Sequence, residues 1–495
     1  MANLASDTDV LIVGAGPIGL FLANECARHN LRWRLIEERS TQSEHSKALA
    51  IFPRTLEIFD MAGVVAPFLE KANRVTKVAV VVRDRALAHM KFEPHQTPYP
   101  FIAMVPQDVT ERLLVEELRH KGGNVEYETR FLSAKQDDDA VKATIERAGE
   151  RNEVRAKFVV GCDGAHSTVR HQLNLAFEGA EYRASFLLAD VETNTSLPAD
   201  EMQLCPSEFG PLAIFPMSAT RRRIVATIEN VEGDAPSLDL VRKILAQRAP
   251  AAIEARAFHW SSYFRIHHRQ VARLGEGRIF IAGDAAHIHS PFGGQGMNTG
   301  LHDVWNLVWK LDLFLEGRGN EQLLGSYSSE RLPVIKSVIE TTDLLTKVMG
   351  TPHKFAQALR DTVIPIVSHL APFQHAFVQR LSELGIAYQG SPIIEGPGER
   401  YFDDSLRGGN GIRGRFLLFL GTEAGTPAKE AANQLAESLS DLIELRFFDK
   451  PGLLLVRPDG YAAFSSRTSD TAAFEAARSV LQRQTMAAGS AAIGG

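Results

Sequence analysis

Cysteine is scarce in this sequence: Cys26, Cys162 and Cys205 are the three cysteines among 495 residues. None of them belongs to a CxxC motif, so neither a zinc ribbon nor a dithiol redox site is expected. Unpaired cysteines suit a reducing compartment, where disulfides rarely persist. The cysteine content therefore favours a cytoplasmic protein.

The sequence also lacks long apolar runs and a strong excess of charge. No uninterrupted run approaches the ~20 apolar residues that a membrane helix needs. The N-terminal stretch MANLASDTDV lacks the basic and then apolar pattern of a signal peptide. The net charge of −6 gives no indication of nucleic-acid binding. We expect a cytoplasmic protein that binds neither membranes nor nucleic acid.

One basic cluster stands out, Arg221–Arg223. Because it lies between apolar runs, we expect it to form a solvated turn between two strands. Hydrophobic residues make up 44% of the chain and charged residues 23%, as in ordinary globular proteins. A chain of 495 residues can bury large cores and is expected to hold two or three domains.

The N-terminal region has the pattern of a strand, a helix and a second strand. Asp9–Val13 is an apolar strand, Leu20–His29 reads as a helix, and Trp33–Glu37 reads as the next strand. The turn between the first two is Gly14–Gly19, which has the form GxGxxG, and Glu37 follows 23 residues after its first glycine. Such a turn lets the main chain and a helix N-terminus approach a pyrophosphate, and the acid accepts hydrogen bonds from a ribose. We predict a dinucleotide site; the alternative is an ordinary tight turn.

Further along, helical and strand patterns alternate. Residues 50–66 and the stretch after Pro106 are expected to be helical, with Asp108 as the N-cap of the second helix. Residues 305–384 are mostly helical in pattern, and residues 391–414 are rich in glycine, proline and charge, which predicts a linker.

Two regions have strand patterns. Val75–Val82 and Ala86–Phe92 are expected to be antiparallel strands. In residues 181–264 the apolar period is close to two, and only Leu238–Gln247 looks helical, which predicts a mainly antiparallel sheet. After residue 415 a small α/β module of strand, helix, strand, strand pair and helix is expected, with a turn at Pro458–Gly460.

Another glycine-rich turn follows the apolar run Arg278–Ala282. It begins with Gly283 and Asp284, continues to Asp303, and contains few bulky side chains. Small residues between a core strand and a core helix let the backbone approach something flat or phosphate-bearing. His287 and His289 lie in this stretch, but two histidines without a third ligand do not predict a metal site.

Three motifs in this order resemble the single-component FAD-dependent aromatic hydroxylases, also called class A flavoprotein monooxygenases. They are Gly14–Gly19, Cys162–Arg170 and the stretch beginning at Gly283-Asp284. Leu455–Tyr461 is similar to the thioredoxin-like third domain of the phenol and aromatic-polyketide hydroxylase branch. That domain would lack CxxC and therefore run no dithiol chemistry, which leaves a packing or oligomer role.

The resemblance implies an α/β fold with three domains and a tail. A Rossmann-like FAD-binding domain would comprise residues 1–74, 101–180 and 265–390. An inserted, mainly antiparallel substrate domain would comprise residues 75–100 and 181–264. A thioredoxin-like domain would span residues 391–486, and residues 487–495 would be a disordered tail.

The resemblance also implies which residues contact the cofactor. Asp284 would accept hydrogen bonds from the ribityl chain of FAD, and Asp163 would serve both FAD and the nicotinamide cofactor. The family often has an arginine near Lys47, and lysine keeps the charge without the bidentate geometry. The expected cofactor-binding set is Gly14, Gly16, Pro17, Ile18, Gly19, Glu37, Arg39, Lys47, Gln107, Arg112, Asp163, Gly283, Asp284, Pro291, Gly293, Gly294, Gly296, Met297 and Asn298.

The implied activity is hydroxylation of a phenolic or polycyclic aromatic molecule by O2 through a flavin C4a-hydroperoxide. NADPH is the expected electron donor, with NADH as an alternative, and a monomer or homodimer is expected. No general base is identified. The substrate pocket should lie between the inserted sheet and the flavin, and core packing is the competing interpretation for its candidate lining residues Met202, Phe209, Phe215, Pro216 and Met217.

Three alternatives remain open at this point. A Baeyer–Villiger oxygenase would use the same scaffold to attack a ketone. A drug-inactivating hydroxylase would be chemically the same and biologically different. A non-catalytic FAD-binding protein is the remote alternative, although a structural flavin needs no small-residue stretch at its reactive face.

Overall fold

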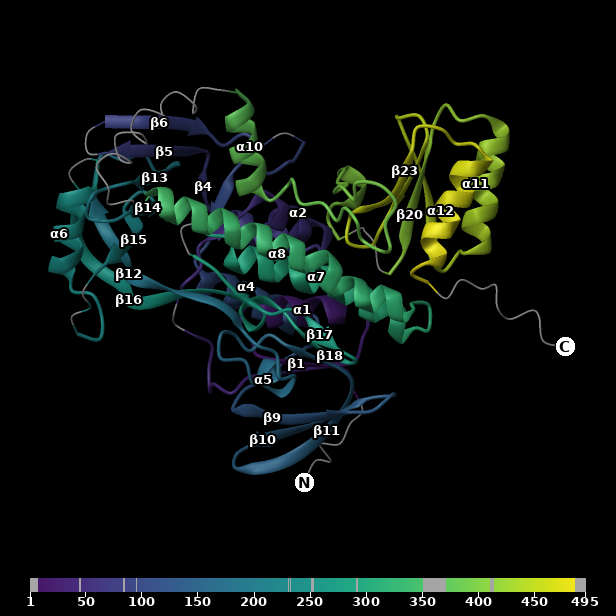
Figure 1. Cartoon of the computed structure of the whole chain (residues 1–495), viewed down its shortest axis with the longest axis horizontal. Coiled ribbons are helices and arrows are strands. Elements are labelled where there is room, and N and C mark those ends of the chain that lie inside the picture. Colours follow the sequence, from purple (N-terminus) through teal and green to yellow (C-terminus); the bar gives the residue numbers. More distant parts are fainter. Residues whose placement is uncertain are drawn as a thin grey trace.

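Two large β-sheets and a smaller C-terminal sheet form the framework of the protein (Figure 1). The computed structural model describes residues 8–43, 46–82, 85–94, 96–229, 231, 233–250, 253–290, 293–349, 371–409 and 414–485. Within this part of the chain, no helix combines the length and the apolar character that crossing a bilayer requires.

The first sheet carries the three glycine-containing turns at one edge. Its order is β17-β18-β11-β1-β2-β8, and β1 pairs in parallel with β11 and β2, as β18 does with β11. The carboxyl ends of parallel strands lie together, so the loops after β1, β11 and β18 meet. The strands are β1 (Thr8–Val13), β2 (Trp33–Ile36), β8 (Val125–Glu126), β9 (Thr129–Gln136), β10 (Val141–Arg147), β11 (Glu150–Gly161), β17 (Gly275–Glu276) and β18 (Ile279–Ile281).

The predicted N-terminal strand, helix and strand are confirmed as β1, α1 (Pro17–Arg28) and β2. Helix α1 packs against α4 (Gln107–His120) and α7 (Gly296–Leu315). Gly19 permits the tight turn into α1, because a Cβ there would lie 1.9 Å from the carbonyl oxygen of Gly14. The local sequence is therefore sufficient to explain this unit.

The second sheet is mainly antiparallel, with the order β19-β16-β12-β15-β14-β13-β5-β6 and one parallel pair, β13 with β5. The predicted antiparallel strand pair and the predicted helix are confirmed as β5 with β6 and as α6 (Leu238–Arg248). The strands are β5 (Lys77–Val82), β6 (Arg85–Lys91), β12 (Glu178–Asn194), β13 (Glu201–Cys205), β14 (Leu212–Pro216), β15 (Arg221–Ile228), β16 (Glu254–Gln270) and β19 (His287–Ile288).

Two predictions about helices between the sheets are wrong. The helix expected over residues 50–66 is divided into β3 (Ala50–Ile51), α2 (Pro53–Met61) and α3 (Val65–Lys71). Pro53 starts α2, where its missing N–H costs nothing, and Gly63 has a φ of 79° that ends the helical path. Asp108 is not an N-cap, because α4 begins at Gln107 and places Asp108 inside its first turn. Strand β3 forms a small sheet with β7 (Ile102–Met104), which also pairs with β4 (Asn73–Val75).

The solvated turn predicted at Arg221–Arg223 is also wrong. These residues begin β15, and Arg222 and Arg223 are each 1% exposed. The guanidinium of Arg223 donates to both carboxylate oxygens of Asp190 at 2.7 and 2.9 Å, and Arg222 donates to the carbonyl oxygen of Leu197. Paired guanidinium groups can be buried, and the sequence does not reveal the distant partner.

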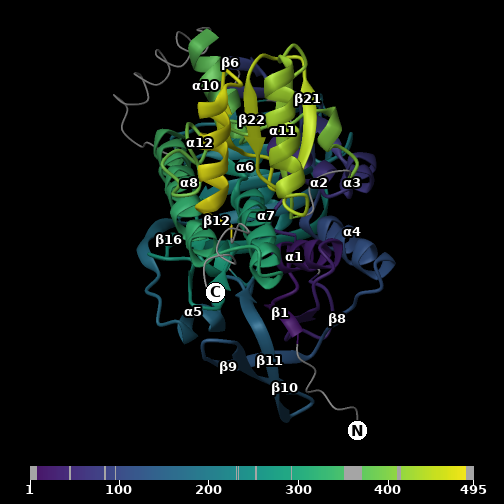
Figure 2. The same cartoon turned by 90° about the vertical axis from the view of Figure 1, so that its right-hand side faces the viewer.

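The C-terminal module has the predicted order of elements (Figure 2). Its hydrophobic core also includes Trp309 and Leu313 of α7. Its sheet has the order β21-β20-β22-β23. Its similarity to thioredoxin stays a prediction, and the tail at residues 487–495 lies outside the described residues. The elements are β20 (Phe416–Gly421), α11 (Thr426–Ser438), β21 (Ile443–Phe448), β22 (Leu453–Val456), β23 (Ala462–Ser466) and α12 (Thr471–Gln482).

Residues 391–409 do not behave as a free linker. Ile393 and Leu406 are fully buried, and the hydroxyl of Ser391 donates to the carboxylate of Glu330 at 2.6 Å. Glu330 belongs to α8 (Glu321–Met349), which packs beside α7. The glycine and proline content of the segment therefore reflects an irregular path that is fixed by buried contacts.

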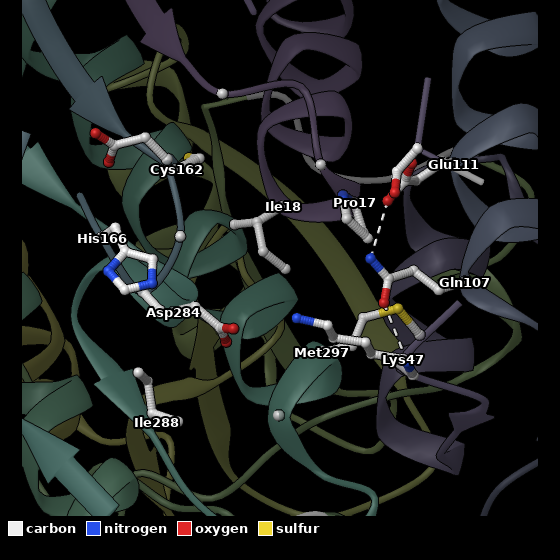
Figure 3. Close-up of a pocket in the computed structure, with 18 of the residues that line it drawn as sticks. Pro17, Ile18, Lys47, Gln107, Glu111, Cys162, His166, Asp284, Ile288 and Met297 are labelled. Carbon is white, nitrogen blue, oxygen red and sulfur yellow. Dashed lines mark hydrogen bonds between the residues drawn. The ribbon is translucent and has the colours of Figure 1, made fainter. Parts of the chain in front are cut away.

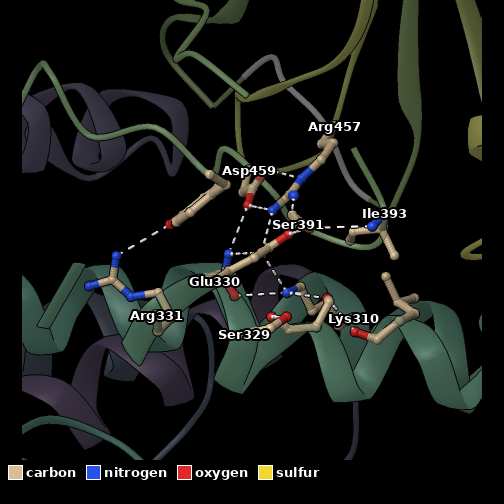
Figure 4. A network of polar contacts seen from close by, with 12 residues as sticks. Lys310, Ser329, Glu330, Arg331, Ser391, Ile393, Arg457 and Asp459 are labelled. Atoms are coloured by element: carbon tan, nitrogen blue, oxygen red, sulfur yellow. Dashed lines mark hydrogen bonds and ion pairs between the residues drawn. The ribbon is translucent and has the colours of Figure 1, made fainter. Parts of the chain in front are cut away.

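A buried ionic network joins the C-terminal module to α7 and α8 (Figure 4). The carboxylate of Glu330 accepts from Arg457 at 2.5 and 3.0 Å and from Lys310 at 2.8 Å. Arg457 also pairs with Asp459, and the side chains of Glu330, Arg457 and Lys310 have no exposed surface. Burial opposes their charges, yet Arg457 and Lys310 hold the pKa of Glu330 below its ordinary value. Buried ion pairs therefore join the module to α7 and α8, and each charge is stabilised by its partners.

We predict that the Arg457→Met substitution lowers the melting temperature markedly. It leaves Glu330 and Asp459 buried with fewer partners, and breaking a buried pair costs about 3–5 kcal/mol. The matched control is Arg483→Met, since Arg483 pairs with Glu395 at the surface and such pairs contribute about 0–1 kcal/mol. Thermal unfolding followed by circular dichroism measures both variants. Equal melting temperatures would show that the docking of the module does not depend on this network.

Candidate functional site

A cavity of about 630 Å³ lies where the loops after β1, β11 and β18 meet (Figure 3). Gly14, Gly16 and Pro17 come from the first loop, Asp163 from the second and Asp284 from the third. The second sheet closes another part of the wall with Leu188, Phe215 and Val225. Three separate sequence motifs therefore contribute to one continuous space.

The first loop leaves room for a ligand against the main chain. Gly14 has a φ of 100°, and a Cβ there would lie 2.6 Å from the carbonyl oxygen of Cys162. At Gly16 a Cβ would meet nothing within 4 Å, although this residue lines the cavity. Gly16 is also the N-cap of α1, and no side chain caps this helix end. Open space beside an uncapped helix N-terminus fits a phosphate group.

Glu37 directly follows β2 and lines the cavity. Its carboxylate accepts from the Ala15 N–H at 2.8 Å and from the Nε of Arg39 at 2.9 Å. Burial acts to raise the pKa of Glu37, but the hydrogen bonds from Arg39 and Ala15 bring it below its ordinary value. The group is therefore a fixed carboxylate beside the first loop.

Two further carboxyl groups face the cavity. Asp163 accepts from the hydroxyl of Ser167 at 2.5 Å and from the Val169 N–H at 3.1 Å, and burial raises its pKa. Asp284 is exposed to the cavity and accepts no hydrogen bond from the described residues, and partial desolvation raises its pKa. Asp284 is therefore available to a ligand that donates hydrogen bonds.

The segment Ser46–Ala48 carries Lys47 into the cavity and is held from two sides. The Ala48 N–H donates to Gln107 Oε1 at 3.0 Å. From the other side, Arg223 donates to the Lys47 and Ala48 carbonyl oxygens at 3.0 and 2.9 Å. Sequence analysis missed Arg223; the apolar residues that follow it, Ile224 and Val225, were the available signal that a strand begins there.

Glu111 is a second residue that sequence analysis missed. It lines the cavity from α4 and is 1% exposed. Its Oε1 accepts from Gln107 Nε2 at 2.9 Å, and burial raises the pKa of Glu111 to about 7. The signal was its position one helical turn after Gln107, which puts both side chains on one face.

Most of the predicted cofactor-binding residues lie in or directly behind the wall of this cavity. Arg112 is exposed and lies outside the wall, and Pro291 is outside the described residues. Asn298 supports the wall, because its side chain bonds to the Ala50 carbonyl and the Phe52 N–H. The predicted residues in the wall are Gly14, Gly16, Pro17, Ile18, Glu37, Arg39, Lys47, Gln107, Asp163, Asp284, Gly294, Gly296 and Met297, whereas Gly19, Gly283 and Gly293 are outside it.

Among the five candidate substrate contacts, only Phe215 lines the cavity. Met202 is buried in the core beside the second sheet, and Met217 packs against the same core. Pro216 lies next to Phe215 at the end of β14 but outside the wall. Phe209 is 52% exposed and lies outside the cavity wall.

The two histidines of the third loop have different surroundings. His287 is buried and its Nε2 lies 2.7 Å from the carboxylate of Asp303. His289 lines the cavity, and its Nδ1 lies 3.1 Å from the Ser290 carbonyl oxygen. Burial lowers the pKa of His289 to about 4, so its imidazole is neutral near pH 7. The two side chains therefore do not converge on one point.

Comparisons with known proteins extend this description. The family model described as an FAD binding domain matches residues 7–342. The chain is 33% identical to a 6-methylpretetramide 4-monooxygenase of Streptomyces rimosus, over 80% of this chain and 72% of that protein. It is 31% identical to a rifampicin monooxygenase of Streptomyces venezuelae, over 92% of this chain and 95% of that protein.

The fold is also similar to that of a solved structure. An anhydrotetracycline hydroxylase from Streptomyces rimosus superposes with a TM-score of 0.76 and 27% identity. The match covers 93% of this chain and 96% of the hydroxylase, so it includes the C-terminal module. Because the family model covers most of the chain and the two relatives align over 80% and 92% of it, the chain belongs to the FAD-dependent aromatic monooxygenases, the class A flavoprotein monooxygenases.

Proposed function

We propose that the protein transfers one oxygen atom from O2 to the ring of an uncharged phenolic or polycyclic aromatic molecule, with NADPH as the electron donor. One observation carries this proposal. The open space at Gly16, the carboxylate of Asp284 and the apolar wall of Phe215 belong to a single cavity. A cofactor with a diphosphate, a polyol chain and a flat ring would meet a suitable surface along its whole length.

In this arrangement the chain holds FAD by three kinds of contact. The diphosphate lies against Gly16 and the N-terminus of α1, where the helix dipole stabilises negative charge. Glu37 accepts from a ribose hydroxyl, and Asp284 accepts from hydroxyl groups of the ribityl chain. The ring then lies near Met297 and the second sheet, which also line the cavity.

When bound, FAD supplies the redox chemistry: it takes electrons from the nicotinamide and activates O2. The residues of this chain orient the reactants and exclude water. Leu188, Phe215 and Val225 form an apolar wall that keeps water from the reacting ring. His289 adds a neutral imidazole to the same cavity. A ring placed between this wall and the flavin would be held close to the oxygen that it receives.

The wall formed by the second sheet supports an uncharged substrate. Arg223 is the charged residue that this sheet contributes to the described wall, and its guanidinium is already paired with Asp190. A substrate carboxylate would therefore lose hydration without gaining a free cation from this sheet. The named substrates of the relatives include a pretetramide and rifampicin, which favours a polycyclic aromatic compound.

The rifampicin monooxygenase suggests a second candidate function, the inactivation of an aromatic drug. The chemistry at the ring would be the same, and only the biological substrate would differ. The two relatives have similar identity to this chain, 33% and 31%, so identity does not favour either function. The substrate that the enzyme prefers distinguishes between them.

We predict that Gly16→Ala weakens FAD binding at least about tenfold, equivalent to about 1.4 kcal/mol. The new methyl group meets no protein atom within 4 Å, so it occupies space that the diphosphate needs. Gly325→Ala is the matched control, because a Cβ at Gly325 also meets nothing within 4 Å and Gly325 lies inside α8. Flavin content after purification and FAD titration measure the effect. Equal FAD affinity in the two variants would contradict the proposed position of the diphosphate.

We predict that one compound from a panel of phenols, polycyclic aromatics, quinones and ketones accelerates NADPH oxidation by the yellow protein. Its product should be heavier by one oxygen atom, carried on the aromatic ring. Mass spectrometry with labelled O2 identifies the atom and its position, and NADH is compared as the donor. An oxygen inserted beside a ketone would instead indicate a Baeyer–Villiger reaction.

A further inference from the structure

Glu111 is a buried acid in the wall of the cofactor cavity for which the proposed reaction gives no use. It lies on α4, facing Pro17 and Gln107 (Figure 3). The residue is 1% exposed, and its Oε2 has no hydrogen-bond partner among the described residues. A fully ionised carboxylate with one oxygen unpartnered in such a place would be costly. The protonation state of this group therefore matters to the site.

The side chain of Glu111 orients the amide of Gln107. Its Oε1 accepts from Gln107 Nε2 at 2.9 Å, which fixes the orientation of the Gln107 amide. Gln107 Oε1 is thereby turned to the Ala48 N–H, 3.0 Å away. The segment that carries Lys47 into the cavity thus depends on Glu111 through one intermediate residue. A protonated carboxyl can accept this hydrogen bond as a carboxylate does.

The charges around Glu111 leave it without a strong cationic partner. Burial is the main cause of its raised pKa, and Glu37 and Asp108 raise it further, whereas Gln107 and Arg39 oppose the shift. Arg39 is already paired with Glu37, with Nε to Oε1 at 2.9 Å. The guanidinium that opposes the shift is therefore already paired with Glu37, whose pKa is lowered.

FAD would bring a diphosphate with two negative charges into this acid-lined space. Glu37, Asp163 and Asp284 line the same cavity as Glu111. We propose that Glu111 is a positioning residue that holds a proton while FAD is bound, so that cofactor binding takes up a proton at this carboxyl and the diphosphate meets one negative charge fewer. The proposal rests on the proposed position of FAD beside Gly16.

The proton on Glu111 determines how the affinity for FAD changes with pH. The negative charge of FAD raises the pKa of Glu111 above its value in the free protein, which is about 7. Below that pH the carboxyl is already protonated, and affinity does not change. Above it, binding must take a proton from solution, so affinity falls by up to about tenfold per pH unit until the pKa of the bound state is reached.

The test compares the holoenzyme with Glu111→Gln, whose neutral amide can still accept from Gln107. Glu116→Gln is the matched control, since Glu116 is an exposed acid on the same helix. Each yellow protein is diluted between about pH 6 and about pH 9, and released FAD is measured by its fluorescence. Calorimetry of FAD rebinding in two buffers of different ionisation enthalpy counts the protons taken up by the wild type.

We expect the dissociation constant of the wild type and of Glu116→Gln to rise about tenfold or more from pH 7 to pH 9, while Glu111→Gln stays nearly constant. Calorimetry should detect an uptake of more than half a proton per FAD by the wild type near pH 8, which does not depend on the variant folding. The same pH dependence in Glu111→Gln, or no proton uptake, would overturn the proposal. Failure of the proposed FAD position is distinguishable, because Gly16→Ala would then bind FAD normally at every pH.

Discussion

The close approach of two main-chain turns sets the shape of the site. The Cα of Gly14 lies so near the peptide of Cys162 that a Cβ would be 2.6 Å from its carbonyl oxygen. Parallel pairing of β1 with β11 brings these turns together, and pairing of β11 with β18 adds the loop of Asp284. A side chain at Gly14 would separate the turns and at Gly16 would fill the space between helix and ligand. The cavity therefore depends on backbone contact more than on any single polar residue.

Electrostatics imposes a second constraint on the same space. An anionic cofactor in this cavity would lie between several carboxyl groups, and the structure would limit the resulting repulsion in different ways. Glu37 is paired with Arg39, while Lys47 reaches the cavity from a segment braced by Gln107 and Arg223. Glu111 has no such cation of its own, so a proton is the remaining means of removing its charge. Glu111 therefore affects both the orientation of the segment Ser46–Ala48 and the charge of the cavity.

The sequence predicted the parts of the fold that local patterns determine. GxGxxG between two apolar strands defined β1, α1 and β2, and alternating apolar residues with a Pro-Asp-Gly turn defined the C-terminal strands. The sequence did not predict features that depend on a partner residue distant in the chain. Arg223 is buried because Asp190 lies 2.7 Å away on β12, and Glu111 matters because Gln107 connects it to Ala48. The part of the cavity wall that the second sheet forms was also poorly predicted, since a strand pattern tells which residues alternate but not which face meets the cavity.

Helix α7 connects the cavity to the C-terminal module. Its first turn contributes Met297 to the cavity wall, and Asn298 fastens that turn to the strand at Ala50. Two turns later Trp305 Nε1 donates to the Asp459 carbonyl oxygen at 3.0 Å, and Lys310 joins the buried network of Glu330 and Arg457. A rigid helix transmits displacement along its axis, and a packed core resists small shifts. Loss of the module would therefore remove buried partners from the same helix whose first turn lines the cavity.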